Sequence, residues 1–142
     1  MTTISTDSFQ LSTRGNAQVI DVTPEVARIV RDRGLEEGHV LVFVQGSTAA
    51  LTTTEFEPGL QRDLPEFFER VAPKAIRYHH NDTWHDGNGH SHVRASLIGP
   101  TLIVPVARGR LLLGTWQQIV LLDFDNRPRE RELIVQVNGR ST

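Results

Sequence analysis

Apolar residues recur at helical spacing in two early segments of the chain, and both segments carry helix start and stop signals. In the first, Thr23 is a possible cap and Pro24 occupies the first helical position, where its missing N–H costs nothing. Gly34 then ends this predicted helix. The second helix is predicted to start near Asp63, with Pro65 in its first turn and Pro73 beyond its end. Their apolar faces are Val26, Ile29 and Val30 in the first, and Leu64, Phe67, Phe68 and Val71 in the second.

Short alternating or β-branched runs account for most of the remaining apolar positions in the first half. The runs 8–12 and 17–22 are separated by Arg14-Gly15-Asn16, which predicts an opening β-hairpin. The runs 40–45 and 49–56 predict two further strands, interrupted by Gly46-Ser47-Thr48. The segment 76–88 is polar and aromatic without a clean period, so we expect a long loop or a broken strand there.

The last third alternates in a way that predicts strands joined by short turns. Val93, Leu97 and Ile98 first indicate a short helix closed by Gly99-Pro100. Four strand-like segments follow, at 101–106, 110–113, 116–123 and 131–137, and they predict a β meander. Together the elements predict one α+β domain over residues 1–142, a β-sandwich or curled, mostly antiparallel sheet with two or three helices.

Composition narrows the classes of function. The chain contains no cysteine, so disulfides and zinc-thiolate sites are excluded. Its formal charge of −2 is spread without long runs of like charge, which argues against a nucleic-acid partner. The apolar runs fall far short of the ~20 residues that cross a bilayer, and the polar start does not resemble a secretory signal. We therefore expect a cytoplasmic protein with no membrane partner.

Five of the six histidines lie between positions 79 and 92, and this cluster is the main candidate site. His90 and His92 are two residues apart, on one face of an extended backbone. With His80 from across the loop they would supply three protein ligands to a divalent metal, Zn²⁺ or Mg²⁺, or bind a phosphate directly. Oxygens of Asn81, Asn88, Asp82 and Asp86 could orient the imidazoles or hold a hard cation. The alternative is a set of surface histidines that stack on Tyr78 or Trp84.

Two other segments are candidates for substrate binding. Ser47 and Thr48 follow an apolar strand in a glycine turn whose free N–H groups could face an anion, or the turn could simply be tight packing. Trp116 could form the floor of a heterocycle site while Gln117 reads its polar edge, or Trp116 could be buried in the core. Phosphate-binding Walker motifs, dinucleotide fingerprints and nucleophile elbows are absent from the sequence, which disfavours nucleotide hydrolysis and ordinary esterase chemistry.

Four sequence blocks together resemble the YjbQ-like family, also called secondary thiamine-phosphate synthase enzymes. The blocks are Gly46-Ser47-Thr48-Ala49-Ala50-Leu51-Thr52, Tyr78-x-His80-Asn81, Asn88-Gly89-His90-Ser91-His92-x-Arg94-Ala95-Ser96-Leu97-Ile98-Gly99 and Leu113-Gly114-Thr115-Trp116-Gln117. The resemblance runs from about Thr23 to Gly139. It implies a compact α+β fold built on a β-sandwich and a homotrimer.

The resemblance also implies an activity, the joining of hydroxymethylpyrimidine diphosphate to a thiazole phosphate with loss of pyrophosphate. His80, His90 and His92 would be the metal or catalytic histidines, with Asn81 and Asn88 beside them. Many relatives have histidine in place of Gly46 and aspartate in place of His90, so this chain departs at two site positions. Three hypotheses follow: an enzyme acting on a phosphorylated small molecule, a non-catalytic protein that binds a metal or small anion, and a metal-dependent hydrolase.

Overall fold

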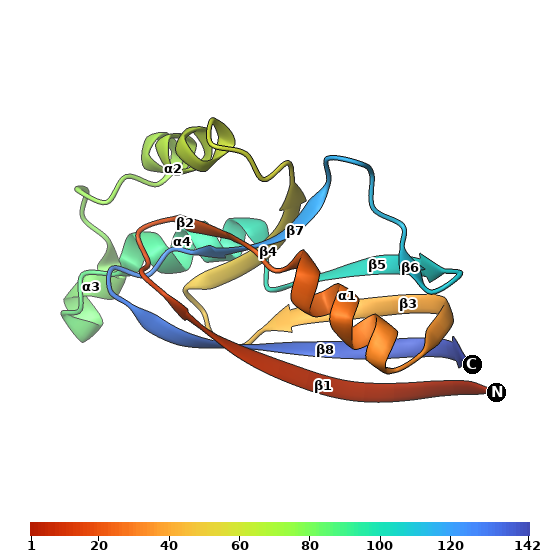
Figure 1. Cartoon of the computed structure of the whole chain (residues 1–142). Coiled ribbons are helices and arrows are strands. Elements are labelled where there is room, and N and C mark those ends of the chain that lie inside the picture. Colours follow the sequence, from red (N-terminus) through yellow and green to blue (C-terminus); the bar gives the residue numbers. More distant parts are fainter.

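The computed structural model describes residues 1–142 and contains eight strands and four helices (Figure 1). The strands are β1 (Thr2–Thr13), β2 (Gln18–Asp21), β3 (Leu35–Val44), β4 (Ala49–Thr54), β5 (Thr101–Ala107), β6 (Arg110–Leu111), β7 (Gln118–Asp123) and β8 (Arg129–Ser141). The helices are α1 (Thr23–Asp32), α2 (Leu60–Val71), α3 (His79–Trp84) and α4 (Gly89–Ile98). None of the four helices has the length and apolar character that crossing a bilayer requires.

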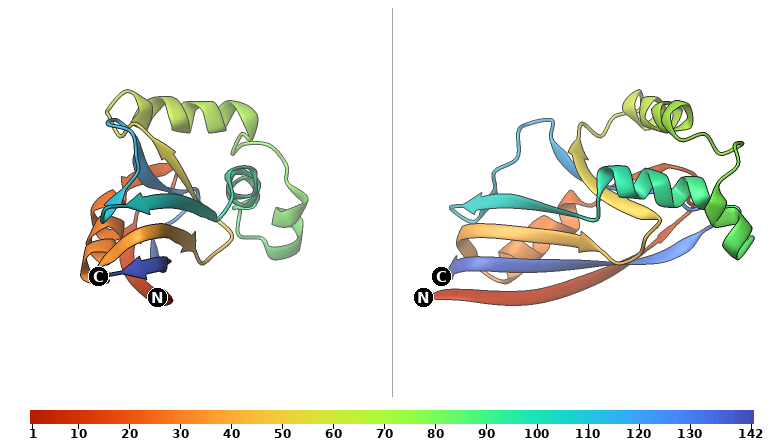
Figure 2. Two further views of the ribbon diagram at one scale, coloured as in Figure 1. Left: turned by 90° about the vertical axis from the view of Figure 1, so that its right-hand side faces the viewer. Right: turned by 180° about the vertical axis from the view of Figure 1, so that it is seen from behind.

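The strands form two antiparallel sheets, which confirms the predicted α+β class. The larger sheet has the order β1-β8-β3-β5-β6 and the smaller one the order β2-β7-β4. The long strands β1, β3 and β8 curve, and the two chain ends lie together at one end of the molecule (Figures 1 and 2). Helices α3 and α4 begin at the opposite end, so the histidine-rich segment lies far from the termini.

Strand β7 is buried on both faces and separates two apolar cores. The inner core lies between the sheets and α1, and Ile119 and Leu121 of β7 belong to it. The outer core lies on the other face of the small sheet, where Leu122 of β7 and Phe124 meet Phe68 of α2 and Ala95 of α4. Because side chains alternate along a strand, a continuous apolar run is what a strand covered on both faces requires. The outer core is what fixes α4 to the small sheet.

The two early helices form where the pattern predicts them, with a correction at the start of each. Helix α1 begins at Thr23, which is its first residue and not its cap, and it buries Val26, Ile29 and Val30. Helix α2 begins at Leu60 rather than near Asp63, and Pro65 lies inside it. The cap is the carboxylate of Glu57, which accepts hydrogen bonds from the N–H groups of Gly59 at 2.8 Å and Leu60 at 2.5 Å. Pro65 is the sixth residue of the helix, beyond its first turn, so α2 lacks one helical N–H bond at that position.

Three local predictions are wrong. The runs at the start of the chain are not a hairpin, since β1 pairs with β8 and β2 pairs with β7 in a different sheet. The last third is not a meander, because β7 joins the small sheet and β8 lies between β1 and β3. The polar segment 76–88 contains the short helix α3, so there are four helices rather than two or three. Alternation identifies a strand but not its partner, and these partners are distant in sequence.

Candidate functional site

The site is built where α3 meets α4. Gly89, the first residue of α4, packs directly on Tyr78, since a Cβ added at Gly89 would lie 2.4 Å from the Cβ of Tyr78. The side chain of Asn81 accepts a hydrogen bond from the N–H of Gly89 at 2.9 Å. This junction brings the rings of His80 and His92 together, with centroids 4.3 Å apart and planes inclined by 48°. Asn81 therefore positions the site and does not line it.

His90 does not join these two histidines, contrary to the expected cluster of three. The backbone at His90 and His92 is helical, so residues two apart point about 200° apart instead of sharing a face. The side chain of His90 is buried under Tyr78, with 2% exposure, and its Nδ1 has no hydrogen-bond partner. No group of three or more His, Cys, Asp or Glu side chains is arranged to hold a metal ion.

His80 and His92 open into a pocket of about 400 Å³, here called the histidine pocket. The β3–β4 turn forms one wall with Gly46, Ser47 and Thr48. Two arginines from the start of β8 complete the floor, and sequence reasoning missed both. The full lining is Gly46, Ser47, Thr48, His80, Trp84, Asp86, Asn88, His92, Arg129 and Arg131.

The arginines are held by two buried carboxylates at the end of β7. Asp123 accepts from Arg131 at both oxygens, with Nε–Oδ2 and Nη2–Oδ1 distances of 2.7 and 3.0 Å. Asp125 accepts from Arg129 Nε at 2.7 Å and from the hydroxyl of Thr48 at 3.0 Å. Both carboxylates are fully buried, so their charges are stabilised by these partners rather than by water. The network fixes the floor of the pocket to the centre of the fold.

Asn88 lies beside His80 and Asp86 at the edge of the pocket. One end of its amide lies 3.1 Å from His80 Nε2 and 2.8 Å from a carboxylate oxygen of Asp86. A carboxylate can only accept, so we assign the amide nitrogen to that end. His80 Nε2 is also 3.4 Å from Asp86 Oδ1. The position of the His80 ring is therefore set by Asn88 and Asp86 together.

Burial and hydrogen bonding shift the pKa values of two groups at the pocket. Burial, helped by the nearby His80, lowers the pKa of His92, and this outweighs the opposite effect of Asp86, Asp125 and Ser47. Burial by itself would raise the pKa of Asp125, but hydrogen bonds from the Arg129 side chain, the Asn126 N–H and the Thr48 hydroxyl hold it below the usual value. The pocket thus contains an ionised carboxylate in its floor and an imidazole that favours its neutral form.

Comparison with known proteins identifies the family of the chain. A family model described as UPF0047 protein YjbQ-like matches residues 7–140. The chain belongs to this family. A UPF0047 protein of Archaeoglobus fulgidus is 41% identical over 126 residues, which are 89% of this chain and 95% of the relative. The UPF0047 protein YugU of Bacillus subtilis is 32% identical over 133 residues, 93% of this chain and 98% of the relative.

Solved structures share the fold. A YbjQ-like protein of unknown function from Sulfolobus solfataricus superposes with a TM-score of 0.93 at 32% identity, covering 99% of this chain and all of the other. A hypothetical protein from Aeropyrum pernix gives a TM-score of 0.87 at 34% identity, covering 97% and 99% of the two chains. The family and the fold are established by these likenesses.

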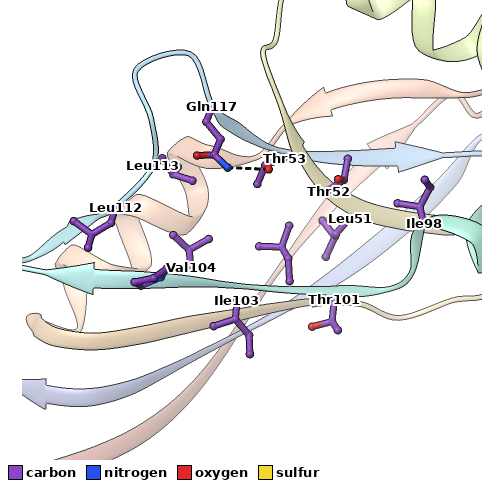
Figure 3. A pocket seen from close by; sticks show the side chains of 12 residues that line it. Leu51, Thr52, Thr53, Ile98, Thr101, Ile103, Val104, Leu112, Leu113 and Gln117 are labelled. Atoms are coloured by element: carbon purple, nitrogen blue, oxygen red, sulfur yellow. Dashed lines mark hydrogen bonds between the residues drawn. The ribbon is translucent and has the colours of Figure 1, made fainter.

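Two predicted substrate-binding residues of this UPF0047 chain lie away from the histidines. Gln117 lines a different groove of about 330 Å³ between β4 and β5, where its amide donates to Thr53 (Figure 3). Trp116 is 70% exposed, so it is neither a pocket floor nor a core residue within this chain.

Arg94 is buried and donates to Glu69 at 2.8 Å and to the Ala72 carbonyl at 3.0 Å, which makes it a structural residue.

Proposed function

We propose that this protein is an enzyme that binds a phosphorylated small molecule in the histidine pocket, with His80 and His92 acting on the phosphate group. The observation that supports it most is the close approach of the two imidazoles above a floor that contains Arg129 and Arg131. Imidazole and guanidinium N–H groups are the donors that phosphate oxygens accept from. Turn residues Ser47 and Thr48 add backbone N–H groups on a third side, and Ser47 adds a hydroxyl.

The charge balance of the pocket favours binding of an anion together with uptake of a proton by the protein. Each arginine of the floor is paired with a buried aspartate, so the floor alone carries little net charge. The lowered pKa of His92 leaves its imidazole mostly neutral near pH 7. A phosphate close to this ring would favour the imidazolium and raise its pKa again. Binding should therefore be coupled to proton uptake, and the charged ring could then donate to a leaving oxygen.

Thiamine-phosphate formation is the named candidate reaction. A diphosphate leaving group develops negative charge as its bond to the pyrimidine methylene breaks, and fixed donors stabilise that charge. His80, His92 and Arg131 would face the leaving group, and His92 would supply the proton. A small anion-binding protein without catalysis is the second candidate, because the same donors would hold an anion with no reacting partner.

A metal-assisted reaction is supported less well by the donor set. The expected ligands His80, His90 and His92 do not fit one ion, because His90 is buried on another side of α4. The remaining donors are two imidazoles and Asp86, whose carboxylate is close to His80 alone. The proposed reaction therefore uses the imidazole and guanidinium donors of the pocket. His80, His92 and Asp86 do not form a three-ligand site either, so a bound Zn²⁺ or Mg²⁺ stays a prediction from the sequence.

The proposal includes a homotrimer, as the resemblance implies. Large apolar side chains are exposed beside the groove between β4 and β5, including Ile103 at 59%, Leu112 at 57% and Trp116 at 70%. When such groups form one contiguous patch, the patch often marks a contact with another chain. Sedimentation equilibrium should give three chains per particle, and Trp116→Ser should shift the distribution towards smaller species.

Replacement of the pocket histidines tests the function. His80→Gln and His92→Gln should weaken pyrophosphate binding, measured by calorimetry, and lower thiamine-phosphate formation by about 10²-fold or more, as expected for loss of an acid–base group. The matched control is His79→Gln, since His79 precedes His80 on α3 but does not line the pocket. Pyrophosphate binding without turnover would favour the binding protein. No binding by the native protein, or equal effects of all three substitutions, would refute the proposal.

A further inference from the structure

A second cavity joins the histidine pocket at the β3–β4 turn. It has a volume of about 190 Å³ and is here called the small-residue cleft. It shares Gly46 and Ser47 with the histidine pocket. Its lining contains no ionisable side chain and consists of Gly46, Ser47, Ala49, Ala95, Ser96, Gly99 and Pro100.

Arg131 points an unused donor at the boundary between the two cavities. The residue is only 6% exposed, and its Nε and Nη2 are bonded to Asp123 and Thr48. No protein group accepts from Nη1. A Cβ added at Gly46 would lie 2.8 Å from that atom. Nη1 is not among the buried side-chain atoms that lack a hydrogen-bond partner, so it reaches the opening and can donate to an acceptor supplied by a ligand.

Gly46 is the residue that leaves this donor uncovered. Its φ of +123° lies in the region that side chains rarely adopt, and any side chain would meet the Arg131 guanidinium. Gly46 lines both cavities, so a ligand that occupies both must pass over it. The missing side chain therefore gives access both to Nη1 and to the path between the cavities.

The walls of the cleft favour an uncharged group. The Gly99 carbonyl already accepts from Leu51 N–H at 3.1 Å, and the Pro100 carbonyl accepts from Val44 N–H at 2.9 Å. The hydroxyl of Ser96 donates to the His92 carbonyl at 2.7 Å. Whole small-molecule sites usually measure about 300–1,000 Å³, so a cleft of this size holds one part of a ligand, about a single ring.

We propose that Gly46 is a specificity-determining residue that selects phosphate esters with a small, uncharged body. The phosphate lies against His80 and His92, the body lies in the small-residue cleft, and the oxygen that joins them accepts from Arg131 Nη1. This inference rests on the proposed function, because it needs an anion in the histidine pocket. It adds the size and charge of the remainder of the ligand.

Calorimetry with two probes, inorganic phosphate and phenyl phosphate, tests the inference. The native protein should bind phenyl phosphate about tenfold or more tightly than inorganic phosphate, as expected from burial of one ring. Ser96→Leu places a larger side chain in the cleft and should remove that preference while inorganic phosphate binds within about threefold of the native value. Gly46→Ala should also remove it, because its Cβ occupies the path. The matched control is Val93→Leu, an exposed position of α4 that lines neither cavity.

The outcomes separate this inference from the proposal on which it rests. If inorganic phosphate binds but phenyl phosphate has no advantage, the cleft is not a ligand site, and the proposed function stands. The inference is also overturned if Ser96→Leu and Val93→Leu affect the phenyl phosphate preference equally. If neither probe binds the native protein, the proposed function fails and the inference with it.

Discussion

The ion pair between Asp123 and Arg131 should be one of the most sensitive points of the fold. Asp123 is fully buried and accepts four hydrogen bonds, two from Arg131, one from the Thr13 hydroxyl at 2.6 Å and one from the Asp125 N–H at 3.0 Å. Asp123→Asn keeps the shape but removes the charge that Arg131 needs. An amide also presents an N–H group to donors that require an acceptor.

Removal of one partner of a buried pair usually costs about 3–5 kcal/mol, because the other charge stays buried without compensation. We expect Asp123→Asn and Arg131→Gln each to lower the free energy of unfolding by about this amount. The double variant should cost less than the sum of the single variants by about 1–3 kcal/mol, since neither charge is then left alone. Thr13 and Asp125 N–H remain as donors in all variants, so the double variant does not recover the native stability.

Urea unfolding followed by circular dichroism, at one protein concentration for all variants, gives the four free energies. Asp7 with Arg33 supplies the control cycle, because this pair has similar geometry, with an Nε–Oδ2 distance of 2.7 Å, but is partly exposed. Replacement there should cost far less than in the buried pair, because solvent screens the exposed charges. A loss below about 1 kcal/mol for Asp123→Asn, or strict additivity in the double variant, would show that the pair does not hold the floor as argued.

Two further outcomes follow from buried rings. Burial lowers the pKa of His90, and the charges of Arg94 and Lys74 lower it further. Below about pH 6.5 the unfolded chain therefore binds more protons than the folded chain. The free energy of unfolding should then fall with falling pH, by up to about 1.4 kcal/mol per pH unit for this group. In urea titrations at several pH values, His90→Asn should make that slope smaller. Part of the slope should remain, because the pKa of His92 is also lowered. An unchanged slope would contradict the assignment to His90. Phe68→Ala should cost about 3–5 kcal/mol because Phe68 is 2% exposed and packs edge-on against Phe124, whereas Phe67→Ala, at 43% exposure, should cost far less. Equal thermal shifts for the two would refute the outer-core placement.

The sequence carried the local structure much better than the pairing. The spacing of apolar residues located α1 and β7, because the residues within each element determine which of its faces are buried. The pairing of β1 with β8 joins residues more than a hundred positions apart, such as Thr13 and Arg129, and no local signal specifies it. The predicted hairpin and meander were wrong for this reason.

The site could be predicted in part. The density of histidines identified the correct segment, and Ser47, Thr48, His80, Asn88 and His92 do line one pocket. The pairing of His90 with His92 assumed extended backbone, and α4 turns those side chains apart. Arg129 and Arg131 could have been suspected from their place beside an acidic strand end, Asp123 and Asp125. Only the fold shows that these charges lie beneath the histidines.

The contrast between the two sides of the histidine pocket has a consequence for motion. Strand β7 is bonded to strands on both edges and covered on both faces, so its amide hydrogens should exchange with solvent only when the whole domain opens. The arginine floor is fixed to the end of that strand. Helix α3 buries no residue, so the amides around His80 should exchange through local opening. The arginine side of the pocket is thus as stable as the whole fold. The α3 side can open locally and close around a bound ligand.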